Sequence, residues 1–148
     1  MLPHVSIEQP LFHAIIAIMT PKEMVEYWLI TADHTWKTAQ DLFEKRDYVD
    51  ALFHGHLYLE KLLKAAAVQA TQKDAPWGHK LNTIAEAAKL TLTSEQDALL
   101  DRVTKYNTKT RYPDWKFEFR KKCNKQFCQG ELDEIQRFGK WLRKQLKP

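Results

Sequence analysis

Apolar residues recur every three or four positions along most of the chain, and this spacing predicts amphipathic helices. A first long helix is predicted from about Glu23 to Lys45 and a second from about Val49 to Ala70, with a turn at Arg46-Asp47 between them. The first apolar stripe comprises Val25, Trp28, Leu29, Ala32, Trp36, Ala39 and Phe43. The second comprises Val49, Leu52, Phe53, His56, Leu59, Leu63, Ala66 and Ala70. Two long helices joined by a tight turn pack antiparallel.

The rest of the chain also has helical patterns, separated by helix-breaking residues. Pro76 ends the second helix, a shorter helix covers Lys80 to about Leu90, and a final helix runs from about Asn124 to Lys147. A capping box formed by Thr93 and Gln96 opens a further helix between these two. No stretch alternates apolar and polar residues for long enough to predict a strand. The sequence therefore predicts an all-α fold, an antiparallel bundle of about five helices whose two long helices come first.

The first twenty residues differ from the rest of the chain. Residues 11–19, LFHAIIAIM, form a short apolar run, but no Lys or Arg precedes it, so a signal peptide is not expected. Thr20 and Glu23 then form a capping box that marks the start of a helix. We interpret residues 1–20 as an N-terminal extension, either from a misassigned start codon or an apolar arm for a partner. Residues 21–148 are predicted to form one helical domain.

Composition favours a soluble, cytoplasmic protein. Hydrophobic residues make up 44% of the 148 positions, which is too many for a disordered chain. No apolar run reaches the ~20 residues of a membrane span. The two cysteines, Cys123 and Cys128, are too few for a zinc site, and on one continuous helix they would lie on different faces. We expect two reduced thiols, no metal and no cofactor.

Charge is divided unevenly along the chain. Residues 105–148 contain 13 Lys or Arg and 5 Asp or Glu, a net of +8, whereas residues 1–104 contain 10 basic and 14 acidic residues, a net of −4. The two parts sum to the overall charge of +4. A basic segment of this kind is typical of proteins with an anionic partner, such as RNA, DNA, a nucleotide or an acidic protein. A solvated helix face rich in Lys gives the same count.

The segment TRYPDWKFEFRKK, residues 110–122, interrupts the helical pattern within the basic third. Its proline excludes Tyr112 from the α conformation, so we interpret RYPD as a connection between helices. In a structural interpretation, Tyr112 packs inward and Arg111 pairs with Asp114 or a helix C-terminus. In a functional interpretation, Arg111 binds a phosphate while Tyr112 or Trp115 stacks on a base. The residues that would complete this nucleotide or nucleic-acid site are Asp114, Lys116, Arg120, Lys121 and Lys122.

Three stretches, in their order along the chain, resemble the HEPN family, the nucleotide-binding domain of higher eukaryotes and prokaryotes. They are ALFHGHLYLEKLLKAAAV (51–68), GHKL (78–81) after a Pro-containing loop, and RYPD (111–114). The resemblance spans roughly Lys22 to Leu146. It implies an antiparallel helical bundle that commonly dimerises and is often encoded beside a small nucleotidyltransferase in a toxin–antitoxin pair. It also singles out four family-motif positions: Glu60, Lys61, Lys64 and His79.

Many members of this family are metal-independent ribonucleases that use an Arg followed, after four to six residues, by a His. If Arg111 is that arginine, the His should fall where this sequence has Lys116, Phe117 or Glu118. No His follows His79, so the ribonuclease motif is absent. The sequence therefore favours a non-catalytic module that binds a nucleotide, RNA or a nucleotidyltransferase partner. The alternative is a degenerate ribonuclease in which Arg111 and His79 form a composite catalytic site.

We also expect a homodimer with no membrane association. Trp28 and Trp36 lie on the first helix, and Tyr27, Leu57 and Tyr58 lie off the main stripes. Together they provide more apolar surface than one bundle core needs. Large contiguous apolar patches are uncommon on monomers, so a second copy is expected to cover this surface.

Overall fold

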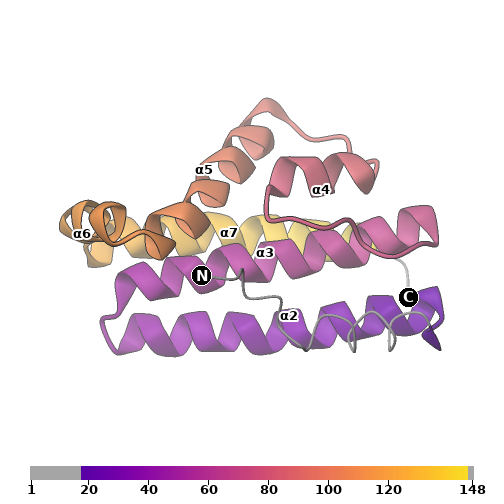
Figure 1. The fold of residues 1–148 in the computed structure, drawn as a ribbon, viewed down its shortest axis with the longest axis horizontal. Helices are drawn as coiled ribbons and strands as arrows, with labels where there is room; N and C mark the ends of the chain where they lie inside the picture. The colour runs from indigo at the N-terminus through magenta and orange to yellow at the C-terminus, as the bar shows by residue number, and fades with distance from the viewer. Residues whose placement is uncertain (1–17, 147–148) are drawn as a thin grey trace, which may run out of the picture.

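The computed structural model describes residues 18–146, and residues 21–145 form six helices, α2 to α7 (Figure 1). The predicted all-α fold is confirmed. Most of the extension predicted over residues 1–20 lies outside the described residues, so neither the misassigned start codon nor the apolar arm is tested. Over residues 18–146, no helix combines the length and the apolar character that crossing a bilayer requires.

The first two helices, α2 (Pro21–Glu44) and α3 (Tyr48–Thr71), form the long pair predicted from the sequence. The predicted capping box is present at the start of α2. The Glu23 backbone N–H donates to the Thr20 hydroxyl, and the Thr20 backbone N–H donates to the Glu23 carboxylate, each at 3.1 Å. Arg46 adopts a left-handed φ of 64° in the tight turn, and the two helices then run antiparallel (Figure 1).

α4 (Leu81–Ala87) and α5 (Ser94–Arg111) lie on the opposite side of α3 from α2 (Figure 1). α4 is shorter than the predicted helix, because the chain leaves the helix and Lys89 adopts a left-handed φ of 57°. α5 begins with the predicted capping box, in which the Gln96 backbone N–H donates to the Thr93 hydroxyl at 3.1 Å. These two helices bring the middle of the sequence back over α3.

The last two helices, α6 (Pro113–Lys122) and α7 (Lys125–Gln145), add an element that the sequence analysis missed. The apolar pattern predicts a break at RYPD and no further helix before Asn124. The proline is instead the first residue of α6, a position where its missing N–H costs nothing. Asp114 in the first turn and three basic residues in the last turn suit the helix dipole. The pattern gave no sign of α6 because Phe119 alone is buried there.

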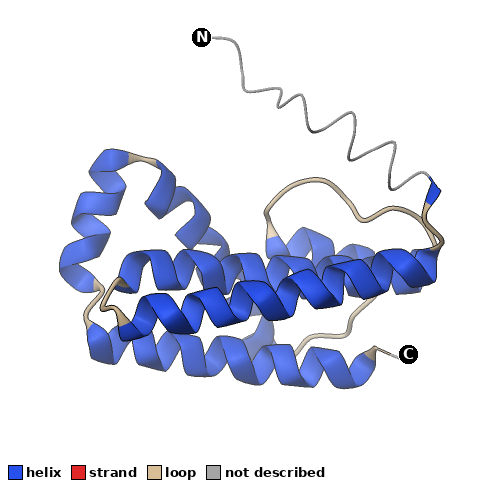
Figure 2. Cartoon of the chain, turned by 90° about the horizontal axis from the view of Figure 1, so that it is seen from below, coloured by secondary structure: helices blue, strands red, loops and turns tan. Residues whose placement is uncertain are grey.

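The three long helices α2, α3 and α7 lie side by side, and α3 is central because it also packs against α4, α5 and α6 (Figures 1 and 2). Tyr58 on α3 lies so close to α7 that Gly139 has no room for a side chain, since a Cβ there would be 2.7 Å from Tyr58 Cε2. Tyr58 also packs against Trp36, with the rings tilted by 40° and their centroids 4.8 Å apart. Two of the aromatic residues assigned to a dimer surface thus pack within one chain.

Candidate functional site

The break at RYPD is a single residue in the structure. Tyr112, with φ −109° and ψ 123°, separates the end of α5 from Pro113 at the start of α6. This extended backbone follows from the clash that a proline imposes on the residue before it. Arg111 is exposed and makes no side-chain hydrogen bond or ion pair within the described part of the chain. The inward Tyr112 and the Arg111–Asp114 pair of the structural interpretation are therefore not seen.

Three large aromatic side chains near this junction face solvent. Tyr112, Trp115 and Phe117 keep 57%, 56% and 62% of their surface exposed. The rings of Tyr112 and Trp115 meet edge to face, with centroids 6.4 Å apart. Exposed apolar groups of this size, concentrated in six consecutive positions, are typical of a binding surface.

Trp115 lines a cleft of about 300 Å³, which we call the α5–α6 cleft. The residues that line it are Lys109, Trp115, Glu118, Phe119 and Lys122. Lys109 Nζ lies 4.9 Å from the centroid of the Phe119 ring. Burial lowers the pKa of Lys109, and repulsion from Lys122 and Lys105 lowers it further. The cleft thus combines apolar ring surface with two amino groups, which suits an aromatic ring attached to an anion.

A second cleft, of about 470 Å³, lies between α6 and the turn that joins α2 to α3, and we call it the turn cleft. Its lining residues are Lys45, Arg46, Asp47, Tyr48, Val49, Asp50, Lys116, Arg120 and Cys123. Four basic and two acidic residues give this lining a formal net charge of +2. Lys116 Nζ lies 3.6 Å from Asp50 Oδ1. Burial and the neighbouring Asp50 raise the pKa of Asp47 above its ordinary value.

The predicted binding residues on α6 share one short helix between these two clefts. Lys121 Nζ lies 3.3 Å from Glu118 Oε1 and 4.7 Å from the centroid of the Phe117 ring. Both members of this ion pair are more than 60% exposed, so the pair adds little stability. Arg120 and Lys122 are exposed and make no ion pair with the described residues. The structure therefore brings the candidate nucleic-acid residues together on a mostly solvent-facing helix.

Three of the four family-motif residues contact one another. Glu60 and Lys64 lie on α3, and His79 lies in the loop before α4. Glu60 is buried, its Oε1 lies 2.7 Å from His79 Nδ1, and its Oε2 accepts a hydrogen bond from Lys64 Nζ at 3.3 Å. The His79 carbonyl accepts a hydrogen bond from His56 Nε2 at 3.0 Å. These contacts attach the Pro-containing loop before α4 to the middle of α3. No local sequence pattern links Glu60 to His79, because they lie nineteen positions apart.

Burial lowers the pKa of two neighbours of this cluster. His56 is fully buried, and burial lowers its pKa more than the His79 carbonyl and Glu60 raise it. The neutral ring donates through Nε2, so Nδ1 is unprotonated and has no hydrogen-bond partner among the described residues. Burial also lowers the pKa of Lys61, the fourth family-motif residue. Its Nζ donates to the Thr35 hydroxyl on α2 at 2.6 Å.

The monomer does not bring His79 to Arg111. His79 contacts α3 at Glu60, whereas α6 contacts α3 through Lys116 and Asp50. Asp50 and Glu60 are ten positions apart on α3, which is about 15 Å along a helix with a rise of 1.5 Å per residue. A composite catalytic site with both residues is therefore not assembled within one chain.

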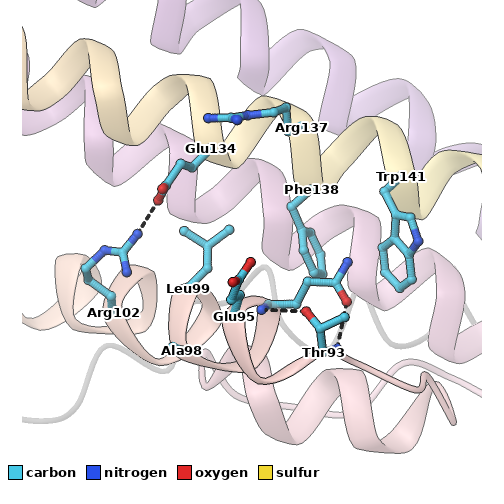
Figure 3. Close-up of a pocket in the computed structure, with 10 residues that line it drawn as sticks. Thr93, Glu95, Ala98, Leu99, Arg102, Glu134, Arg137, Phe138 and Trp141 are labelled. Atoms are coloured by element: carbon cyan, nitrogen blue, oxygen red, sulfur yellow. Dashed lines mark hydrogen bonds and ion pairs between the residues drawn. The ribbon is translucent and has the colours of Figure 1, made fainter.

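A further cleft, not predicted from the sequence, lies between α5 and α7 (Figure 3). It measures about 530 Å³ and is lined by Thr93, Glu95, Gln96, Ala98, Leu99, Arg102, Glu134, Arg137, Phe138 and Trp141. Arg102 is held by ion pairs with Glu131, at 3.0 Å, and with Glu134. The lining residues are dispersed over nearly fifty positions, so no local motif could have indicated this cleft. The basic residue that α5 contributes is already neutralised, which makes this cleft a weaker anion site than α6.

The two cysteines do not lie on one continuous helix, because the break between α6 and α7 falls between them. Cys123 follows the last residue of α6, and Cys128 is the fourth residue of α7. Both are buried free thiols, and they lie on either side of the cap residue Asn124. No group of three or more metal-ligating side chains occurs within residues 18–146.

Comparison with known proteins identifies the class of this helical bundle. The sequence model of the HEPN domain family matches residues 25–145, and the chain therefore belongs to the HEPN family. A solved structure, that of TT1696 from Thermus thermophilus, is similar with a TM-score of 0.70 and 23% sequence identity. The similarity covers 82% of this chain and 98% of that one, and at this identity it supports the fold alone. No curated protein matches the chain significantly.

Proposed function

We propose that this HEPN domain is a non-catalytic module that binds single-stranded RNA along α6. The observation that carries the proposal is the exposed pair Tyr112 and Trp115 beside a dense group of cations. Single-stranded nucleic acid offers flat bases for stacking and phosphates for Lys and Arg, so a surface of this composition can bind both parts. The absence of the Arg–His ribonuclease motif from the sequence supports binding without cleavage.

The distribution of charge supports a strand rather than a single nucleotide as the ligand. Basic residues line both the α5–α6 cleft and the turn cleft, and α6 between them is 10 residues long, about 15 Å. We assign a stacked base to Trp115, with Lys109 and Lys122 near its phosphate. Arg111 contributes a two-pronged phosphate contact at the junction of α5 and α6. A free nucleotide would occupy one cleft and leave the other unused.

The experiment that tests this proposal compares two exposed tryptophans. Fluorescence anisotropy with a labelled single-stranded RNA measures the affinity of Trp115→Ala and of Trp77→Ala, a matched control on the loop before α4. Loss of one stacked base should weaken binding by about 1–3 kcal/mol for Trp115→Ala. Trp77→Ala should bind within about twofold of the wild type, a difference below about 0.5 kcal/mol. The proposal fails if the wild type binds no RNA at low salt or if both variants bind equally well.

Cleavage of RNA is the second candidate function, and one observation favours it. When His79 donates its Nδ1 proton to Glu60, Nε2 is left as a proton acceptor on a side chain that is 54% exposed. A carboxylate that orients a histidine in this way recurs in general-base catalysis. A second copy of the chain would have to supply the phosphate-binding arginine, because Arg111 and His79 are apart in the monomer.

Incubation of purified protein with RNA in EDTA distinguishes binding from cleavage. A non-catalytic module leaves the RNA intact while still binding it. Metal-independent cleavage that is lost in both Arg111→Ala and His79→Gln would replace our proposal with the ribonuclease. Cleavage that is equal in the wild type and both variants would indicate a contaminating nuclease.

We further propose that the module acts with partner chains, as a homodimer and beside a small nucleotidyltransferase in a toxin–antitoxin pair. Membership of the HEPN family supports both associations. Tyr27 and Ile30 on α2 remain exposed and provide apolar surface for a dimer. Sedimentation at low micromolar concentration should give twice the monomer mass, and a single 17.5 kDa species would contradict the dimer. A nucleotidyltransferase gene beside the coding sequence would support the pair.

A further inference from the structure

The corner between α6 and α7 holds both cysteines. Cys123 is the C-terminal cap of α6, and the next residue, Asn124, is the N-terminal cap of α7. The Asn124 side chain accepts a hydrogen bond from the Phe127 backbone N–H at 2.8 Å, which fixes the start of α7. The Cys128 thiol donates a hydrogen bond to the Tyr48 carbonyl at 3.5 Å. Cys123 precedes the cap of α7 and Cys128 is its fourth residue, two positions that pack against each other at a capped helix start, and both are buried in the same core cluster. The helix break thus brings together two thiols that would lie on different faces of one straight helix.

Cys123 is the member of the pair that faces a route from solvent. It lines the turn cleft, together with Lys116 and Arg120, whereas Cys128 is completely buried. The neighbouring Cys128 thiol lowers the pKa of Cys123, while the neighbouring Cys123 thiol and burial raise the pKa of Cys128. The thiolate is the reactive form of cysteine, so both access and acidity favour reaction at Cys123.

We propose that Cys123 and Cys128 form a reversible intramolecular disulfide when the protein meets a hydroperoxide, with Cys123 as the thiol that reacts first. This modification site stands independently of RNA binding. The disulfide connects the end of the basic helix α6 to the first turn of α7.

The chemistry takes two balanced steps. The Cys123 thiolate attacks one oxygen of the hydroperoxide, the O–O bond breaks, and Cys123 becomes a sulfenic acid while the departing alkoxide takes a proton. The Cys128 sulfur then attacks the Cys123 sulfur and displaces hydroxide, which leaves as water with the Cys128 proton. One hydroperoxide and two thiols give one disulfide, one alcohol and one water. A dithiol reductant reverses the modification.

Tryptic digestion provides a direct test, because Lys125 lies between the two cysteines. The folded wild-type chain is exposed to hydrogen peroxide, its free thiols are blocked with iodoacetamide, and it is digested without reduction. Peptides 123–125 and 126–137 should then appear linked in mass spectra and separate on addition of dithiothreitol. Absence of the linked pair, or disulfides that join different chains, would overturn the proposal.

Two variants test the order of reaction. Cys128→Ser lacks the second thiol, so it should accumulate a sulfenic acid at Cys123 that dimedone captures. Cys123→Ser should leave Cys128 unmodified under the same exposure, and rapid oxidation of Cys128 there would show that Cys123 is not the first thiol to react. Circular dichroism checks that each variant is folded. If a variant does not fold, the wild-type digest still decides whether the disulfide forms.

Discussion

Glu60 and Lys64 on α3 are largely buried and paired, whereas the charged residues along α6 are mostly exposed. At α3, Glu60 is buried and each of its oxygens has a partner, in His79 and Lys64. On α6, Arg120 and Lys122 point to solvent beside exposed aromatic rings. Burying an unpaired charge is costly, so folding itself explains the complete pairing at α3. Folding does not require an aromatic, basic surface on α6, and this difference is why we assign structure to the first region and binding to the second.

The largest expected difference between the regions is in stability. Leu59 on α3 is fully buried, so Leu59→Ala should lower the free energy of unfolding by about 2–5 kcal/mol. Trp115→Ala removes a larger side chain but an exposed one, and it should change stability by less than about 0.5 kcal/mol. Urea denaturation of both variants measures these values. A loss for Trp115→Ala as large as that for Leu59→Ala would place α6 in the core and break the comparison.

A second test compares one carboxylate from each region. Glu60→Ala leaves Lys64, whose side chain is only 13% exposed, without its partner, so stability should fall by about 1–3 kcal/mol. Glu118→Ala removes the exposed partner of Lys121 and should cost less than about 0.5 kcal/mol. Urea denaturation at neutral pH measures both. Equal effects in the two variants would mean that the Glu60 cluster is no more structural than a surface ion pair.

The buried histidine beside α3 should make stability depend on pH. The pKa of His56 lies below its ordinary value of 6.5, so in the interval between the two values the unfolded chain binds a proton that the folded chain does not. Stability should therefore fall as pH decreases below 6.5, by up to about 1.4 kcal/mol per pH unit. His56→Gln keeps a donor for the His79 carbonyl and should reduce this slope. The exposed control His34→Gln should retain it, and identical slopes would contradict the assignment.

The smallest effect concerns the exposed lysines on α6. Each phosphate contact contributes a slope of about −0.7 to the dependence of log affinity on log salt for single strands. Replacing Lys121 and Lys122 by Ala should therefore flatten that slope by up to about 1.4 without changing the melting temperature. The exposed control pair Lys22→Ala and Lys73→Ala should leave the slope unchanged.

Arg111→Ala provides a single-residue comparison in the same RNA-binding measurement. Arg111→Ala should weaken RNA binding more per residue removed than the lysine pair, because a two-pronged contact is harder to replace. If neither Arg111→Ala nor the lysine pair alters affinity, α6 is only a solvated surface, and the partner is a protein or a free nucleotide.

Local sequence was sufficient for the elements whose cause is local. The capping residues Thr20 and Thr93 satisfy backbone groups within three positions, so both helix starts could be predicted before any tertiary contact was known. The apolar periodicity of α2 and α3 likewise reports burial on a single face, and the tight turn between them dictates their antiparallel packing. The same reasoning failed for α6, because a helix that buries only Phe119 leaves no apolar period to detect.

The candidate site also combines features that local sequence determines with features that depend on tertiary packing. The sequence alone determined that Tyr112 is extended, because Pro113 excludes the α conformation, and that basic and aromatic residues crowd the positions after it. Only the tertiary structure decided that His79 meets Glu60 and stays away from Arg111, and that Cys123 and Cys128 flank a helix corner. The physical reason is the separation along the chain over which each interaction acts. Capping, proline sterics and helical periodicity act between neighbouring residues, whereas pairing and burial depend on where distant segments pack.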